Sequence, residues 1–139
     1  MTPALELHPR LAADCHRLGR WPEGALLLHR NATLPWFIMV PAGEVEQLIE
    51  LPPARRRAVT ERWYALAAWV DRRFDCDRVN LGAIGNLVPQ LHLHAVGRRR
   101  DDPAWPGVVW GCSLPEASWS TTQLEDLRRE LREAIALEP

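Results

Sequence analysis

Apolar runs separated by short polar breaks dominate the first third of the chain. The run "ALLLHR" is followed by the turn-like "NATLP" and then by "WFIMVP". Two short apolar runs on either side of a polar break predict an antiparallel pair of buried strands. An earlier stretch, "CHRLGRW", predicts one further strand, and Pro41 and Gly43 end the second apolar run.

From Glu44 onward the apolar positions repeat with the period of a helix. "EVEQLIEL" predicts a short helix that stops at Pro52 and Pro53. Pro53 suits the first turn of a second helix, because the N–H that proline lacks is not needed there. This second helix is long and amphipathic, and its apolar stripe is Val59, Trp63, Leu66, Trp69, Val70 and Phe74. We interpret its arginine-rich face as solvent-exposed.

The second half of the chain returns to strands and ends in a helix. "CDRVNLGAIGN" predicts a strand interrupted by glycines, "LVPQLHLHAVG" predicts a clear strand, and "RRRDDPAWPGVVWG" predicts a loop. A helix is predicted for residues 121–137, in which Thr121 or Thr122 could be the cap and Glu125 is placed for a capping box with Thr122. Its apolar stripe is Leu124, Leu127, Leu131 and Ile135. The order of elements predicts an α+β fold, with an antiparallel sheet covered on one face by the long helix. We expect residues 1–139 to form a single domain.

Composition narrows the class of protein. The chain has 139 residues and a formal net charge of −1, which gives no reason to expect a nucleic acid polymer or an anionic membrane as partner. No segment is long and apolar enough for a membrane helix, and the N-terminus has no signal-peptide pattern. The three cysteines are Cys15, Cys76 and Cys112, and without a CxxC pair they do not predict a disulfide framework or a structural zinc site. We therefore expect a cytoplasmic protein.

The segment "QLHLH" places three polar side chains on one face of its predicted strand. Gln90, His92 and His94 are two residues apart, so the two imidazoles would lie about 6.6 Å apart along the strand. That separation suits a phosphate group, and histidine supplies both a nucleophilic nitrogen and a proton carrier near neutral pH. Two other interpretations stay open from the alternation alone: solvent-facing histidines, or two ligands of a metal ion in a metal-dependent enzyme.

The same segment resembles the signature of the histidine triad (HIT) family, in "VPQLHLHAVGR". "ALLLHRNATLPWFIMVP" resembles the N-terminal strand pair of the family, and "VNLGAIGN" resembles its glycine-bearing strand and turn. "AWPG" resembles the segment that follows the triad in the phosphoramidase branch, and the spacing resembles a bacterial subgroup described as diadenosine tetraphosphate hydrolase-like. The resemblance covers residues 25–110.

The resemblance implies a HIT-like fold of about five antiparallel strands with one long helix and a C-terminal helix, usually as a homodimer. It also implies a reaction in which the central histidine, here His92, attacks the α-phosphorus of a nucleotide and forms a nucleotidyl-histidine. His94 would contact the phosphate or the leaving group, and Gln90 would orient its neighbours. No cofactor is required, although a divalent metal can accompany a polyphosphate substrate.

Several positions carry implied roles or depart from the family pattern. The implied nucleotide-binding residues are Asn31, Asn80, Gly85, Asn86 and Trp105. Asn31 and Asn80 are alternatively residues that only complete local backbone structure, and Trp105 is alternatively a packing residue. The departures are Gln90 at the first triad place, Trp36 where a further histidine is common, and Leu87 where a serine or threonine is common.

We therefore predict a nucleotide hydrolase or nucleotidyl transferase acting on a dinucleoside polyphosphate or a nucleoside phosphoramidate. The departures motivate an alternative, a nucleotide-binding module with little or no catalysis. Arg98, Arg99 and Arg100 are expected to be solvated or paired with Asp101 and Asp102, although they could attract phosphate.

Overall fold

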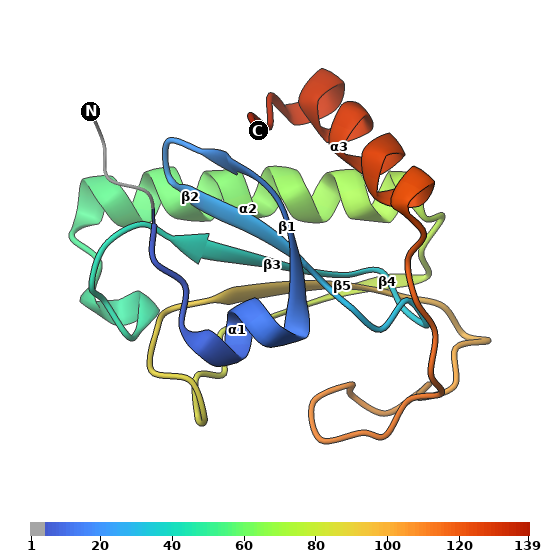
Figure 1. Ribbon diagram of the computed structural model, residues 1–139. Helices are drawn as coiled ribbons and strands as arrows, with labels where there is room; N and C mark the ends of the chain where they lie inside the picture. The colour runs from blue at the N-terminus through green and yellow to red at the C-terminus, as the bar shows by residue number, and fades with distance from the viewer. Residues whose placement is uncertain (1–4) are drawn as a thin grey trace.

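The computed structural model describes residues 5–139, whose backbone forms a mixed α and β structure around one sheet (Figure 1). The five strands of these residues are β1 (Cys15–Trp21), β2 (Gly24–His29), β3 (Trp36–Pro41), β4 (Arg78–Gly82) and β5 (Leu93–Arg98). They lie in the order β1-β2-β3-β5-β4, and every neighbouring pair is antiparallel. The predicted α+β fold with an antiparallel sheet of about five strands is confirmed.

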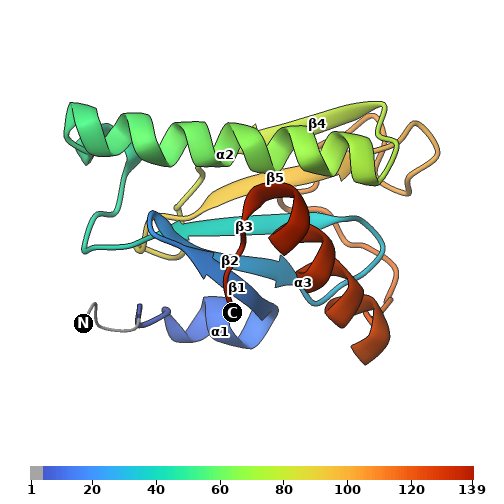
Figure 2. The same cartoon turned by 90° about the horizontal axis from the view of Figure 1, so that it is seen from above.

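The long helix α2 (Pro53–Arg73) and the C-terminal helix α3 (Thr121–Ile135) pack against one face of the sheet (Figure 2). Alternate strand residues point into this layer, among them Leu26, Leu28, Phe37 and Met39. The predicted helical stripe faces them: Val59, Leu66, Trp69 and Val70 are buried, and Trp63 and Phe74 are partly buried. Neither α2 nor any other helix of residues 5–139 is long and apolar enough to cross a bilayer.

The opposite face of the sheet carries a second apolar cluster under α1 (Pro9–Asp14), which Figure 1 shows on the other side of the sheet from α2. The strand residues that alternate with the first set contribute here: Leu27, Trp36, Ile38, Val40 and Val96. Helix α1 contributes Leu11. We did not predict α1, because six residues are too few to show a helical period.

Two predicted elements are shorter than expected. The strand over "LVPQLHLHAVG" begins only at Leu93, because the backbone N–H of Leu91 donates to the carbonyl oxygen of Val45 in a loop, and Pro89 has no N–H to donate. The helix over "EVEQLIEL" is only a 3₁₀ turn, Leu48–Glu50, followed by Leu51 in an extended conformation. The predicted segments were therefore in the right places, but with wrong boundaries.

The N-cap of the C-terminal helix lies one or two residues earlier than predicted. Ser120 is the N-cap residue, and its capping box is with Gln123, so the prediction of Thr122 and Glu125 was wrong. The N-cap hydroxyl accepts from the Gln123 backbone N–H, which Ser120 reaches because it is the last residue in an extended conformation. The predicted stripe is confirmed, with Leu127 and Leu131 buried.

Candidate active site

His92 lies just before β5, in the irregular segment after the turn at residues 84–88. Its ring nitrogen Nδ1 is 2.7 Å from the backbone carbonyl oxygen of Gln90. A carbonyl oxygen only accepts hydrogen bonds, so Nδ1 carries the proton and Nε2 keeps its lone pair in the neutral ring. The side chain is only 8% exposed. The fold therefore holds an imidazole whose free lone pair is on Nε2.

His94 lies on β5 opposite Ile38 of β3, on the same face of the sheet. The indole Nε1–H of Trp36 donates to its Nδ1 over 2.9 Å, and an indole N–H can only donate. The neutral ring of His94 therefore carries its proton on Nε2. Burial, followed by the charges on His92 and His29, lowers the pKa of His94 to about 3, so this ring stays neutral near pH 7.

The two imidazoles lie side by side. Their ring centroids are 5.0 Å apart at an interplanar angle of 66°, which is closer than the spacing predicted along a regular strand, because His92 lies outside β5. The indole of Trp110 packs edge-on against His94, with centroids 5.4 Å apart. The pair is thus held in an aromatic setting with little access to water.

His29 is a third imidazole at this site, and it is not among the predicted site residues. Its ring stacks on Trp36 with centroids 4.7 Å apart, and its Nδ1 accepts from the backbone N–H of Asn31 at 3.1 Å. Its proton in the neutral ring is therefore on Nε2. Burial lowers the pKa of His29, and the carboxylate of Asp14 partly offsets this. The available signal was strand alternation, because His29 follows Leu27 by two residues and so faces the same side of the sheet as Trp36.

A cavity of about 390 Å³ lies against these imidazoles. Its walls come from α1, from β2 and β3, from the turn after β4, and from the loop around residue 110. The lining residues are Arg10, Leu11, Asp14, Cys15, His29, Trp36, Ile38, Ile84, Gly85, Asn86, Leu87, Val88, His92, His94, Trp110 and Gly111. A second cavity of about 400 Å³ adjoins it and shares His92 and residues 84–86. His92 therefore faces two hollows at once.

The cavity combines one nucleophilic nitrogen with several hydrogen-bond donors. His92 offers the lone pair of Nε2, whereas His94 and His29 each keep a proton on Nε2. The thiol of Cys15 is no rival nucleophile, because burial first, and then Asp14, raise its pKa to about 12. Arg10 is the one arginine or lysine among the described lining residues, and it lies 3.9 Å from Asp14.

Four of the eight predicted site residues line this cavity, namely His92, His94, Gly85 and Asn86. Gly85 has a φ of 65°, a left-handed conformation that glycine adopts without strain, and it forms the turn before the histidines. The side chain of Gln90 points elsewhere. Its Oε1 accepts from the backbone N–H of His8, and its Nε2 donates to the carbonyl oxygen of Glu6.

Asn31 completes a turn and does not line the cavity. Its Oδ1 accepts from the backbone N–H of Thr33, and its Nδ2 donates to the carbonyl oxygen of Pro115. This is the local backbone role that the sequence left open as the alternative.

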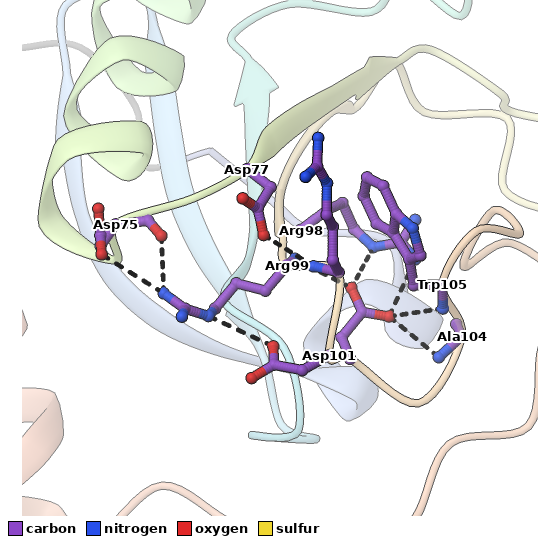
Figure 3. A network of polar contacts seen from close by, with 9 residues as sticks. Asp75, Asp77, Arg98, Arg99, Asp101, Ala104 and Trp105 are labelled. Atoms are coloured by element: carbon purple, nitrogen blue, oxygen red, sulfur yellow. Dashed lines mark hydrogen bonds and ion pairs between the residues drawn. The ribbon is translucent and has the colours of Figure 1, made fainter.

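Asn80 and Trp105 belong to a separate network around Arg98, and Figure 3 shows the part of this network that contains Trp105. The guanidinium of Arg98 donates to Asn80 Oδ1, pairs through two nitrogens with Asp102, and lies 5.6 Å from the centre of the Trp105 ring. Arg98 is only 2% exposed, so this arginine is a structural residue, and the expected pairing with Asp102 is confirmed. Arg99 pairs with Asp101 as expected.

No group of three or more His, Cys, Asp or Glu side chains in residues 5–139 is arranged to hold a metal ion.

Comparisons with known proteins all point to one protein family. The sequence profile of the HIT domain matches residues 10–101. A histidine triad protein from Marinobacter aquaeolei VT8 is 37% identical, with a TM-score of 0.86 over 94% of this chain and 96% of that one. A histidine triad protein from Bradyrhizobium japonicum is 32% identical, with a TM-score of 0.87 over 96% and 99%. No functionally curated protein matches the chain significantly.

Proposed function

The chain belongs to the HIT domain family, and we propose that it binds a nucleotide beside His92 and hydrolyses or transfers the nucleotidyl group at the α-phosphorus. The observation that carries this proposal is the hydrogen bond from His92 Nδ1 to the Gln90 carbonyl. It leaves the lone pair on Nε2, at a cavity whose other two imidazoles are donors.

In the proposed first step, His92 Nε2 forms a bond to the α-phosphorus while the bond to the leaving group breaks. The leaving group departs with the electron pair and takes a proton from solvent. The imidazole becomes positively charged, and its Nδ1–H bond to the Gln90 carbonyl stabilises that charge. In the second step, the oxygen of water attacks phosphorus and loses a proton to solvent, the N–P bond breaks, and the electron pair returns to Nε2.

His94 acts in this scheme as a fixed donor and not as an acid. Its Nδ1 already accepts from Trp36, and its pKa of about 3 keeps the ring neutral, so Nε2–H can donate to a phosphate oxygen without losing its proton. A donor that is held in place before the reaction stabilises developing charge without reorganisation. The backbone N–H groups of Gly85 and Asn86 are proposed as further donors from the turn.

The charge around His92 favours a substrate with few negative charges. Within the described residues, the first cavity has Arg10 as its one cation, and the second has Glu46 and no lysine or arginine. Arg98 and Arg99 are paired with aspartates in the other network. A polyphosphate leaving group would need more cations, so we propose a nucleoside phosphoramidate before a dinucleoside polyphosphate.

To test this function, the protein is mixed with adenosine 5′-phosphoramidate, and AMP release is followed together with a rapidly quenched protein adduct. The wild type should release AMP through a phosphorus-linked imidazole, and His92→Gly should lose at least about 100-fold in kcat. Free imidazole should restore part of the activity of His92→Gly. His16→Gly, at a histidine outside the cavity, is the control, and equal turnover of wild type and His92→Gly would refute the proposal.

One observation favours a second candidate, a binding module with little turnover. The first triad place contributes no side chain to the cavity, because Gln90 is bonded to Glu6 and His8. In addition, Leu87 is 75% exposed at the position where a phosphate-binding hydroxyl is common in the family. Tight AMP binding without AMP release or adduct would favour this candidate.

A further inference from the structure

We infer that Gln90 is a positioning residue that ties the segment 6–8 to the core and so sets the α1 wall of the nucleotide cavity. Its effect on ligand binding rests on the proposed function, whereas its effect on the segment 6–8 does not. This role differs from the orientation of neighbouring imidazoles that the first triad place implies.

The primary amide of Gln90 makes two hydrogen bonds to one short stretch of backbone. Oε1 accepts from the N–H of His8 at 2.8 Å, and Nε2 donates to the carbonyl oxygen of Glu6 at 3.0 Å. Both partners are main-chain atoms two residues apart. The side chain therefore bonds this stretch as one residue of a neighbouring parallel strand would, and it joins positions that are 82 and 84 residues apart in the chain.

This tether is directly connected to the cavity wall. His8 is the N-cap residue of α1: its Nδ1 accepts from the backbone N–H of Arg10, and its carbonyl oxygen accepts from Ala12 N–H. The lining residues Arg10, Leu11 and Asp14 follow within that short helix. Because α1 has only six residues, its position depends on the groups that hold its two ends. Loss of the tether would free the N-terminal end.

His92 does not need the side chain at position 90. The hydrogen bond that fixes its Nδ1 proton goes to the backbone carbonyl of Gln90, which every residue type supplies. A histidine at position 90 could not replace the amide. The carboxamide presents its donor and its acceptor from a single carbon, whereas the two ring nitrogens of imidazole point in different directions. Glutamine here is therefore suited to the tether and not to the chemistry.

The first experiment measures hydrogen exchange and AMP affinity in Gln90→Leu and Gln90→His. The His8 and Ala12 amides should exchange at least about tenfold faster in both variants, because the tether that protects the start of α1 is lost. The Kd for AMP and the KM should rise by about fivefold to tenfold, which corresponds to one or two lost hydrogen bonds. We expect kcat within about twofold of wild type and an unchanged pH profile.

A second pair of variants tests the same tether without a change at Gln90. His8→Pro removes the N–H that Gln90 binds, and the φ of −53° at this position suits proline. His8→Ala removes the same imidazole cap but keeps the N–H. His8→Pro should therefore raise the KM more than His8→Ala does, and its effect should not add to that of Gln90→Leu.

The outcomes separate this inference from the proposed function. An unchanged hydrogen-exchange rate of the His8 amide in Gln90→Leu would refute the tether. A Gln90→Leu variant with a lower kcat, an altered pH profile and an unchanged KM would also refute it. A wild-type protein that binds no AMP would refute the proposed function, and the hydrogen-exchange comparison would still decide the tether.

Discussion

The imidazoles around the cavity differ in which ring nitrogen is free, and this difference comes from their neighbours. Trp36 can only donate, so it turns His94 into an Nε2–H donor. The Gln90 carbonyl can only accept, so it leaves His92 with its lone pair on Nε2. Trp36 stands where the family often has a histidine, and unlike a histidine it cannot change its role with pH.

Replacing Trp36 by phenylalanine should let the neutral ring of His94 exchange between its two tautomers. The loss of Nε1–H leaves a buried acceptor unpaired, which costs about 1–3 kcal/mol of unfolding free energy. We expect kcat to fall about tenfold, because only part of the His94 population then keeps its proton on Nε2. Urea unfolding and imidazole ¹⁵N shifts measure the two effects.

Trp110→Phe is the matched control, because this indole also packs against His94, but its Nε1 has no hydrogen-bond partner among residues 5–139. It should change the His94 tautomer little. Equal ¹⁵N shifts of His94 in the wild type and in Trp36→Phe would contradict the assigned role of Trp36.

Acid should destabilise the protein through His94. Its pKa is about 3 in the folded state and about 6.5 for an ordinary histidine, so the unfolded chain binds more protons between these values. The stability that depends on neutral His94 is therefore complete above about pH 6.5 and is lost as the pH falls toward 3, by at most about 1.4 kcal/mol per pH unit. Urea unfolding at pH 7, 6, 5 and 4 should show a smaller loss of unfolding free energy in His94→Gln than in the wild type. Equal losses in the two proteins would be evidence against a buried, neutral His94.

At the scale of elements, the carboxylate of Asp102 fixes the loop that follows β5. Asp102 pairs with buried Arg98 and also accepts from the backbone N–H groups of Ala104 and Trp105, so it joins β5 to the loop that follows it (Figure 3). Burial alone would raise the pKa of Asp102, but its hydrogen bonds with Arg98 and backbone N–H groups lower it. This loop leads on toward Trp110 and the cavity.

Asp102→Asn should lower the unfolding free energy by about 3 kcal/mol, because it leaves the charge of Arg98 buried without a partner. Asp101→Asn changes the same charge at a side chain that is 79% exposed, and it should leave the urea midpoint almost unchanged. A similar loss of stability in both variants would contradict this prediction, because it would show that the buried Arg98–Asp102 pair contributes no more than the exposed Arg99–Asp101 pair.

The start of β5 shows what the alternation of polar and apolar residues could not predict. Alternation placed His94 and Val96 on one face correctly, because residues of β5 obey the two-residue period. It could not show that the strand stops short of His92, because that depends on the Leu91 N–H finding a carbonyl oxygen in the loop at Val45.

At the scale of the whole molecule, the two edges of the sheet differ. The outer edge of β1 is partly paired, because Arg20 and Glu138 exchange two backbone hydrogen bonds. Among the described residues, no strand pairs with the outer edge of β4, and the nearby apolar side chains of Leu81 and Ile84 are 46% and 43% exposed. An unpaired edge with exposed apolar residues is a template for association.

The expected homodimer should therefore form through β4. Leu81→Lys places a charge at this edge and should shift the sedimentation coefficient from a dimer to a monomer. Tyr64→Lys is the comparison, because this exposed side chain lies on α2 and should leave association intact. A wild-type chain that sediments as a monomer would refute the expectation.

The sequence by itself determined the class of fold, the long helix and the two histidines, because periods of two and 3.6 residues and the "HLH" spacing are local properties. Tertiary structure alone decided which nitrogen of His94 carries the proton, the inclusion of His29 among the cavity residues, and the absence of Asn31, Asn80 and Trp105 from the cavity lining. The partner of His94 lies 58 residues away, and the partners of Gln90 lie 82 and 84 residues away. The proton position of His94 and the α1 wall of the cavity depend on such contacts, which no local pattern records.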